Sequence, residues 1–307
     1  MIGILLEIGL LFLRIGLAYC EALISAIVPP RRKNITGEVV LITGAGHGIG
    51  RCLALEFAKV GAKLVLWDIN QEGNEETAAE IRTIGVSVNT YTVDVTQKDE
   101  IYNAAAKVQR EVGNVDILVN NAGILHGIEL LRLSDEQIER IIAVNTMAHF
   151  WTIRTFLPNM IQRNHGHIVT IASMAAKQGV ARLVDYTASK YAVAGLTEAL
   201  SDEIRDMKKT GIKTTTVCPF FVDTGMTKYP NQRFPKLNPL LEPEQVAMEA
   251  VDGVLRNKVE IIIPSNLKLS LSLKNPLVPR KVGQLVMDFF DVGIAAQDSE
   301  PNKDKDI

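Results

Sequence analysis

The fold is decided by the stretch Val39-Val-Leu-Ile-Thr43, which continues directly into Gly44-Ala-Gly-His-Gly-Ile-Gly50. The first five residues are apolar or β-branched and predict a buried strand, and the residues after the glycine-rich run predict a helix. Small residues at such a junction let the backbone approach a pyrophosphate placed above the helix N-terminus. The junction therefore predicts a dinucleotide site.

An acidic residue in the next predicted strand strengthens this interpretation. The run Leu-Val-Leu-Trp ends at Asp68, 18 positions after Gly50. A carboxylate there accepts hydrogen bonds from ribose hydroxyls and repels a 2′-phosphate. His47, where a cation would favour a 2′-phosphate, carries no fixed charge. The sequence therefore favours NAD over NADP.

Apolar strands and helix-like stretches alternate through residues 34–264, which we interpret as one domain. The predicted strands are Val39–Thr43, Lys63–Trp67, Ser87–Val93, Asp116–Asn120, His167–Ala172, Lys213–Cys218 and Glu260–Pro264. The predicted helices are 48–60, 71–84, 97–112, 134–161, 184–209 and 243–256. Such alternation is typical of βαβ units. It predicts an α/β, doubly wound, Rossmann-type fold with a parallel seven-stranded sheet and helices on both faces.

Composition excludes several classes of protein. The chain has 33 Lys and Arg against 35 Asp and Glu, a net charge of −2, which gives no electrostatic case for nucleic acid. The hydrophobic fraction of 47% excludes wholesale disorder. The three cysteines are far apart and make neither a disulfide framework nor a zinc site, so no metal site is predicted.

The N-terminal segment is strongly apolar. Residues 1–28 contain three charges, Glu7, Arg14 and Glu21, which fall along one stripe of a helix. Such a helix is about 40 Å long and can cross a hydrocarbon core of about 30 Å, or it can lie in the interface with its charges in water. The basic run 31–33 favours a cytosolic location for the domain after it. We predict that residues 1–30 form a hydrophobic membrane-anchor helix.

The region after the predicted sheet has a different character. Residues 265–293 mix apolar and basic residues and are interrupted by two prolines, which suits either a membrane surface or a C-terminal helix packed on the domain. Residues 294–307 predict a disordered tail. The irregular segment 225–241 is expected to cover a substrate pocket.

Several polar residues carry the predicted chemistry. Tyr186 and Lys190 are spaced i, i+4, on one face of a predicted helix, where an ammonium would lower the pKa of the phenol. Ser173 and Asn121 each follow a predicted strand, and Asn145 lies in the helix between those strands. Because the carboxyl ends of parallel strands form the ligand crevice, we expect these side chains to meet there.

Over residues 38–263, this set of motifs resembles the short-chain dehydrogenase/reductase family. The resemblance implies that Tyr186 is the acid/base that exchanges a proton with the substrate oxygen and that Ser173 hydrogen-bonds that oxygen. Lys190 would lower the tyrosine pKa and bind the nicotinamide ribose, and Asn145 would hold a proton-relay water.

The same resemblance implies a set of cofactor contacts, with Asp94 at the adenine and Thr224 at the carboxamide. Phe220 departs from the family, in which glycine usually follows the proline. The implied NAD-binding residues are Gly44, Gly46, His47, Gly48, Ile49, Gly50, Asp68, Asp94, Val95, Asn121, Ala122, Gly123, Tyr186, Lys190, Pro219, Val222 and Thr224.

A finer resemblance joins the chain to the group of 17β-hydroxysteroid dehydrogenases type 11 and type 13 and epidermal retinol dehydrogenase 2. It rests on the apolar N-terminus, on Leu-Trp-Asp-Ile-Asn at 66–70 and on Cys-Pro-Phe-Phe-Val-Asp-Thr-Gly-Met at 218–226. It implies a lipophilic alcohol or ketone substrate, such as a steroid 17β-hydroxyl or retinol, and a homodimer. It also implies a location on the endoplasmic reticulum membrane or the lipid droplet, with the catalytic domain facing the cytosol.

Two other functions are weighed against this one. A lipid-droplet scaffold that keeps the fold would have no use for the complete set of Ser173, Tyr186, Lys190 and Asn145. A sugar-nucleotide epimerase on a similar fold would have a different glycine spacing and no reason for an anchor.

Overall fold

The computed structural model describes residues 2–226, 230–231, 233–235, 239–271 and 278–294. The chain separates into two units, residues 1–34 and residues 35–307. The first unit contains helix α1 (Ile2–Ile27). Its stretch Leu6–Ser25 is long and apolar enough to cross a membrane by length and composition.

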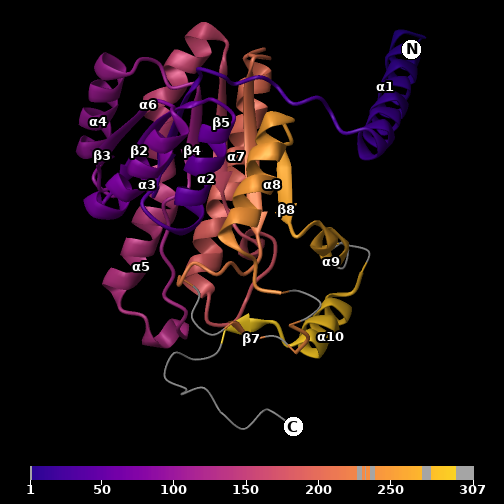
Figure 1. Ribbon diagram of the computed structural model, residues 1–307. Coiled ribbons are helices and arrows are strands. Elements are labelled where there is room, and N and C mark those ends of the chain that lie inside the picture. The colour runs from indigo at the N-terminus through magenta and orange to yellow at the C-terminus, as the bar shows by residue number, and fades with distance from the viewer. Residues whose placement is uncertain (1, 227–229, 232, 236–238, 272–277, 295–307) are drawn as a thin grey trace. The chain divides into compact units, whose positions relative to one another are not determined.

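The second unit is built on a parallel sheet of seven strands in the order β3-β2-β1-β4-β5-β6-β8 (Figure 1). The strands are β1 (Val39–Thr43), β2 (Lys63–Asp68), β3 (Val88–Thr92), β4 (Ile117–Asn120), β5 (Gly166–Ile171), β6 (Ile212–Pro219) and β8 (Glu260–Ile263). The predicted seven-stranded doubly wound sheet is confirmed. The strand order reverses between β1 and β4, and the crevice at such a switch point is where ligands bind in this architecture.

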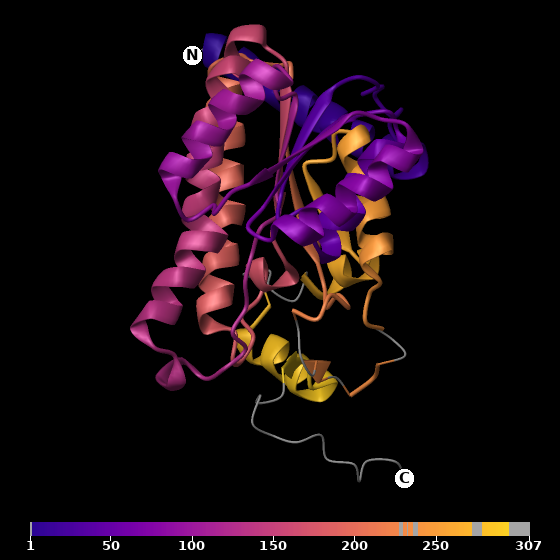
Figure 2. The same ribbon diagram turned by 60° about the vertical axis from the view of Figure 1, so that its left-hand side comes forward.

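Helices cover both faces of the sheet, as Figure 2 shows from the side. Helices α2 (Gly48–Lys59), α3 (Gln71–Ile84) and α8 (Pro243–Leu255) pack on one face, and α4 (Lys98–Glu111), α6 (Ala148–Arg163) and α7 (Val184–Asp206) pack on the other. Each face has its own buried apolar cluster, because side chains of a parallel strand alternate between two covered faces. The rigid sheet fixes the strand ends that carry the site.

The helix predicted over 134–161 is continuous from Asp135 to Arg163, but it contains a π-helical segment. It begins at a capping box between Ser134 and Gln137, as α5 (Asp135–Ile142), and passes through a π-helical segment, η2 (Ala143–Met147), into α6. A π segment inserts one residue into the helical hydrogen-bond pattern and often occurs at functional sites. Here it places the buried Asn145 toward the end of β4.

Short elements lie at the carboxyl end of the sheet. They are η1 (Leu130–Arg132), η3 (Met174–Ala176), η4 (Ser265–Leu267), α9 (Lys268–Leu271) and α10 (Arg280–Phe290), with β7 (Pro230–Asn231) paired antiparallel to β9 (Gly293–Ile294). In Figure 1, β7 and α10 lie beyond the end of β8. The segment expected to cover the pocket, 225–241, thus pairs with the C-terminal region. Of the predicted tail, Ile294 is a buried strand residue, and 295–307 lie outside the described residues.

Candidate active site

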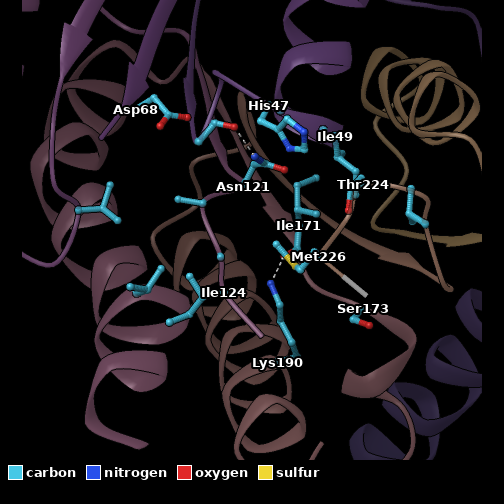
Figure 3. A pocket seen from close by; sticks show the side chains of 18 of the residues that line it. His47, Ile49, Asp68, Asn121, Ile124, Ile171, Ser173, Lys190, Thr224 and Met226 are labelled. Carbon is cyan, nitrogen blue, oxygen red and sulfur yellow. Dashed lines mark hydrogen bonds between the residues drawn. The ribbon is translucent and has the colours of Figure 1, made fainter. Parts of the chain in front are cut away.

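A cavity of about 300 Å³ opens at the carboxyl ends of the central strands, and Figure 3 shows its lining side chains. The structure brings together there all the predicted site residues except Gly46 and Asn145, which are not among the lining residues. His47 and Asp68 are at one end of the cavity, and Lys190 and Ser173 are at the other (Figure 3). Its volume is at the lower limit for sites that hold drug-sized molecules, about 300–1,000 Å³.

The glycine-rich loop is shaped by close backbone contacts. Gly44 has φ +66°, and a Cβ atom there would lie 2.9 Å from Cα of Ala122. A Cβ atom at Gly50 would overlap the carbonyl oxygen of Gly44. The Asn121 amide donates to the carbonyl oxygens of Thr43 and Gly44, both at 3.0 Å, and so joins the loop to the end of β4.

The start of α2 supplies the donors that a pyrophosphate needs. His47 is the N-cap residue, and its side chain makes no capping hydrogen bond. The first backbone N–H groups of an α-helix have no partner within the helix, and the helix dipole favours negative charge there. Because His47, Gly48, Ile49 and Gly50 line the cavity, these residues fit a dinucleotide phosphate.

Two carboxylates beyond the loop are held in place by backbone donors. Asp68 accepts hydrogen bonds from the N–H groups of Gly46 and Asn70, both at 2.8 Å. Asp94 accepts from the backbone N–H of Thr96 at 2.9 Å and from its hydroxyl at 2.8 Å. Both line the cavity with a fixed orientation, which suits hydrogen bonding to ribose and adenine.

Three of the four predicted catalytic side chains, those of Ser173, Tyr186 and Lys190, meet at the other end. Ser173 follows β5, and its hydroxyl lies close enough to that of Tyr186 to affect the tyrosine pKa. Lys190 lies one turn along α7 from Tyr186; its Nζ donates to the carbonyl oxygen of Ile171 at 2.9 Å and lies 5.6 Å from the tyrosine ring centroid. The i, i+4 spacing therefore places both groups on the face of α7 that meets the end of β5.

Burial has the largest effect on the pKa values of Tyr186 and Lys190 in the chain without ligand. It raises the pKa of Tyr186 to about 12, and the Ser173 hydroxyl acts in the opposite direction. Burial also lowers the pKa of Lys190 to about 8. The expected lowering of the tyrosine pKa by Lys190 is therefore not found in the chain alone. The lysine Nζ is directed to the carbonyl oxygen of Ile171 rather than to the phenol oxygen.

Asn145 does not line the cavity, but it is hydrogen-bonded to the backbone of a residue that does, Ile124. Its Oδ1 accepts from the N–H of Ile124 at 2.8 Å, and its Nδ2 donates to the carbonyl oxygen of Ile124 at 2.9 Å and to the Ser189 hydroxyl at 3.1 Å. Asn145 is fully buried, while Ile124 lines the cavity. The structure thus gives Asn145 the role of fixing the chain after β4.

The loop after β6 contains Phe220, the residue that departs from the family pattern, and is held by its own contacts. The N–H of Phe220 donates to the carbonyl oxygen of Ile263 at 2.8 Å, and its ring packs on Phe221 with centroids 4.6 Å apart. Thr224 lies close to Gly48, where a Cβ atom would come within 3.1 Å of the threonine methyl group. Thr224 therefore lies directly over the glycine-rich loop.

A second cavity of about 50 Å³ adjoins the first at Ser173, Tyr186 and Phe220. Most of its lining residues are apolar, and we call it the apolar cavity. The remaining lining residues, none of them predicted from the sequence, are Leu125, Met174, Ala175, Gln178, Val180, Leu183, Phe221 and Val292. The residues missed in the large cavity are Ile69, Val93, Ile124, Arg140, Val144, Ile171, Ala172, Phe220 and Met226. Most are apolar and carry no chemical signature. Position alone could have indicated Ile171 and Ala172, which directly precede Ser173.

Comparison with known proteins agrees with this geometry. Residues 38–233 match the family described as short chain dehydrogenase. The chain therefore belongs to the short-chain dehydrogenase family, and it is an oxidoreductase of that class. Human 17-beta-hydroxysteroid dehydrogenase 13 is 47% identical over 278 residues, which are 91% of this chain and 92% of that protein. Human estradiol 17-beta-dehydrogenase 11 is 47% identical over 276 residues, 90% and 91% of the two chains. The predicted resemblance to types 11 and 13 is confirmed.

Solved structures support the fold and a nucleotide cofactor. A short-chain dehydrogenase/reductase from Burkholderia phymatum in complex with NAD has a TM-score of 0.71 and 27% identity, over 78% of this chain and 93% of that one. A metagenomic short-chain oxidoreductase in complex with NADP has a TM-score of 0.62 and 29% identity, over 75% and 97%. Proteins of this fold thus occur with either cofactor.

Proposed function

We propose that this protein transfers a hydride between NAD and the hydroxyl-bearing carbon of a lipid alcohol, such as a steroid 17β-hydroxyl or retinol. The observation that carries the proposal is the meeting of Ser173, Tyr186 and Lys190 where the larger cavity, which the glycine-rich loop lines, joins the apolar cavity. A reacting carbon at this junction would lie between a nucleotide on one side and an apolar pocket on the other.

The chain's own residues handle the proton. A bound nicotinamide supplies the hydride acceptor in oxidation and the hydride donor in reduction. Tyr186, with its proton on the phenol oxygen, protonates the ketone oxygen in reduction; in oxidation it accepts the hydroxyl proton after losing its own. Ser173 holds the substrate oxygen beside the phenol, and Lys190 places a positive charge near the ring.

We assign NAD rather than NADP on the basis of Asp68. Its carboxylate is fixed by two backbone hydrogen bonds at the end of β2 and lines the cavity. A 2′-phosphate on the adenosine ribose would meet that negative charge at short range, whereas free ribose hydroxyls can donate to it.

We assign a lipid substrate from the apolar lining of the second cavity and from the names of the relatives. That cavity presents mainly aliphatic and phenylalanine side chains beside the two catalytic hydroxyls. The names of both human relatives refer to 17β-hydroxysteroid oxidation, and this supports a steroid or similar alcohol. Retinol has a comparable apolar body and belongs in the same test.

We further propose that residues 1–30 anchor the protein to the endoplasmic reticulum membrane or lipid droplet, with the catalytic domain, 34–264, in the cytosol. The apolar helix α1 and the basic residues after it support this arrangement. Residues 265–293 add apolar and basic side chains that suit the same surface. The homodimer stays a prediction, which a mass measurement in detergent would test.

The experiment is turnover of the full chain in detergent with estradiol, retinol and a long-chain alcohol, each with NAD and with NADP. Tyr186→Phe removes the transferred proton and should abolish turnover while leaving the Kd for NADH unchanged. Tyr102→Phe, on the exposed surface of α4, is the matched control. Turnover by Tyr186→Phe within a few-fold of the unmutated protein would contradict the assignment.

A further inference from the structure

The apolar cavity is closed on one side by the C-terminal end of the described chain. Val292 lines it, and Ile294 beside it is 2% exposed and packs with Leu183 and Phe221. We call residues 291–294 the strap. The strap is thus part of the wall that faces Ser173 and Tyr186.

With the strap in this position, the cavity admits only a small group. A water-sized group needs roughly 10–15 Å³ of cavity volume. About 50 Å³ therefore holds roughly three to five such groups, enough for a short alcohol. A steroid or retinoid skeleton is several times larger than a short alcohol and does not fit in about 50 Å³. A bulky alcohol can therefore occupy this cavity only if the wall moves.

One arginine holds the strap to the rest of the site. Arg182 Nη1 donates to the carbonyl oxygen of Ile294 at 2.6 Å, and Arg182 Nε donates to Glu129 Oε1 at 2.8 Å. Arg182 has φ +63°, a strained conformation for a residue other than glycine, which persists only where the surroundings impose it. The bond from Arg182 also lowers the pKa of Glu129. The guanidinium therefore connects the strap to the loop after β4.

The loop after β4, which Arg182 contacts through Glu129, is also held by bonds that do not involve Arg182. Asn145 holds Ile124 by two hydrogen bonds, and His126 Nδ1 lies 2.8 Å from Asp185 Oδ2, whose side chain is 1% exposed. Apart from Arg182, the strap has the two-residue pairing of β7 with β9, a bond from Asn231 to Asp291 at 3.0 Å, and the packing of Ile294 on Leu183 and Phe221. Within the described residues, it has no buried side-chain ion pair of its own to match that of His126 with Asp185. Loss of the Arg182 bonds should therefore loosen the strap and leave the loop in place.

We propose that Arg182 is a specificity-determining positioning residue. It latches the strap over the apolar cavity, so that short alcohols bind the latched form and bulky alcohols bind only the unlatched form. The apparent Kd of a ligand that needs a minor form is its intrinsic Kd divided by the fraction of that form. The latch thus weakens the binding of bulky alcohols selectively. This proposal rests on the proposed alcohol dehydrogenase function.

The test compares Arg182→Gln with the unmutated full chain, using 2-butanol and estradiol with NAD. Unlatching should lower the KM for estradiol at least fivefold with kcat within twofold, while the KM for 2-butanol stays the same or rises. Arg182→Lys, which can reach one of the two oxygens, should give an intermediate KM. Arg205→Gln, on an exposed part of α7, is the control and should change nothing. An unchanged or higher KM for estradiol in Arg182→Gln overturns the proposal.

Hydrogen exchange separates failure of the latch from failure of the proposed function. Amides of residues 291–294 should exchange faster in Arg182→Gln than in the unmutated protein, whether or not any alcohol is turned over. Equal exchange overturns the latch even if the protein is an active dehydrogenase. If Arg182→Gln does not fold, Glu129→Gln decides by the same two measurements, with smaller shifts in the same direction expected.

Discussion

Replacing Lys190 with methionine should make the protein more stable at neutral pH while removing its activity. The ammonium is buried, and its pKa is about 8 instead of 10.5. Each pKa unit corresponds to about 1.4 kcal/mol, so burial of the charge costs about 3 kcal/mol of folding free energy at pH 7. Methionine fills a similar space without the charge. It loses the hydrogen bond to the Ile171 carbonyl oxygen, which costs about 1 kcal/mol. The net expected gain is about 2 kcal/mol.

The gain should depend on pH in a defined direction. Below pH 8, both the folded and unfolded chains carry the Lys190 proton, and the penalty is complete. Between pH 8 and 10.5, the folded chain loses this proton first, so the stability of the unmutated protein rises with pH relative to the variant. Tyr186 also titrates at alkaline pH, but it is present in both proteins, and its effect largely cancels in the difference.

The assay is denaturant unfolding of both proteins without ligand, in the same detergent, at pH 7 and pH 10. Lys190→Met should be the more stable protein at pH 7, and the difference should shrink or reverse at pH 10. Lys98→Met, at an exposed lysine, controls for removal of a positive charge and should show neither effect. A Lys190→Met variant that is less stable at pH 7, by an amount independent of pH, would refute the argument from burial.

Three further outcomes are expected. Asp68→Asn should raise kcat/KM with NADP at least tenfold relative to NAD, because the charge facing a 2′-phosphate is removed; a protein that already prefers NADP without mutation would contradict this assignment. Alcohol oxidation should accelerate with pH from 7 to 9 and ketone reduction should not, because oxidation needs deprotonated Tyr186, whose pKa is raised to about 12. Initial rates in both directions measure this. Oxidation rates that do not change with pH would count against Tyr186 as the base. A chain without residues 1–33 should leave the membrane fraction, and Asn34, in an Asn-Ile-Thr sequon, should carry no glycan in cells; a glycan there would place the domain in the lumen.

The sequence by itself determined the sheet and the nucleotide end of the site. Short, continuous apolar runs between helices are typical of parallel strands that are buried on both faces of a sheet. The seven predicted strands agree with the observed ones to within one residue at each end. The glycine-rich loop could also be predicted from the sequence, because Gly50 lies so close to the Gly44 carbonyl oxygen that no side chain fits there. These features depend on neighbours close in sequence or on the regular geometry of strands.

Only the tertiary structure decided the rest. The predicted helix over 134–161 contains a π segment, because Asn145 must reach the backbone of Ile124. The pKa of Tyr186 rises rather than falls, since burial is a property of everything packed around a residue and not of its spacing from Lys190. The wall of the apolar cavity joins residues near 125, 180, 220 and 292, and its latch joins Glu129, Arg182 and Ile294. Such long-range contacts between irregular segments leave no periodic pattern in the sequence, because they arise only when the sheet brings the ends of its strands together.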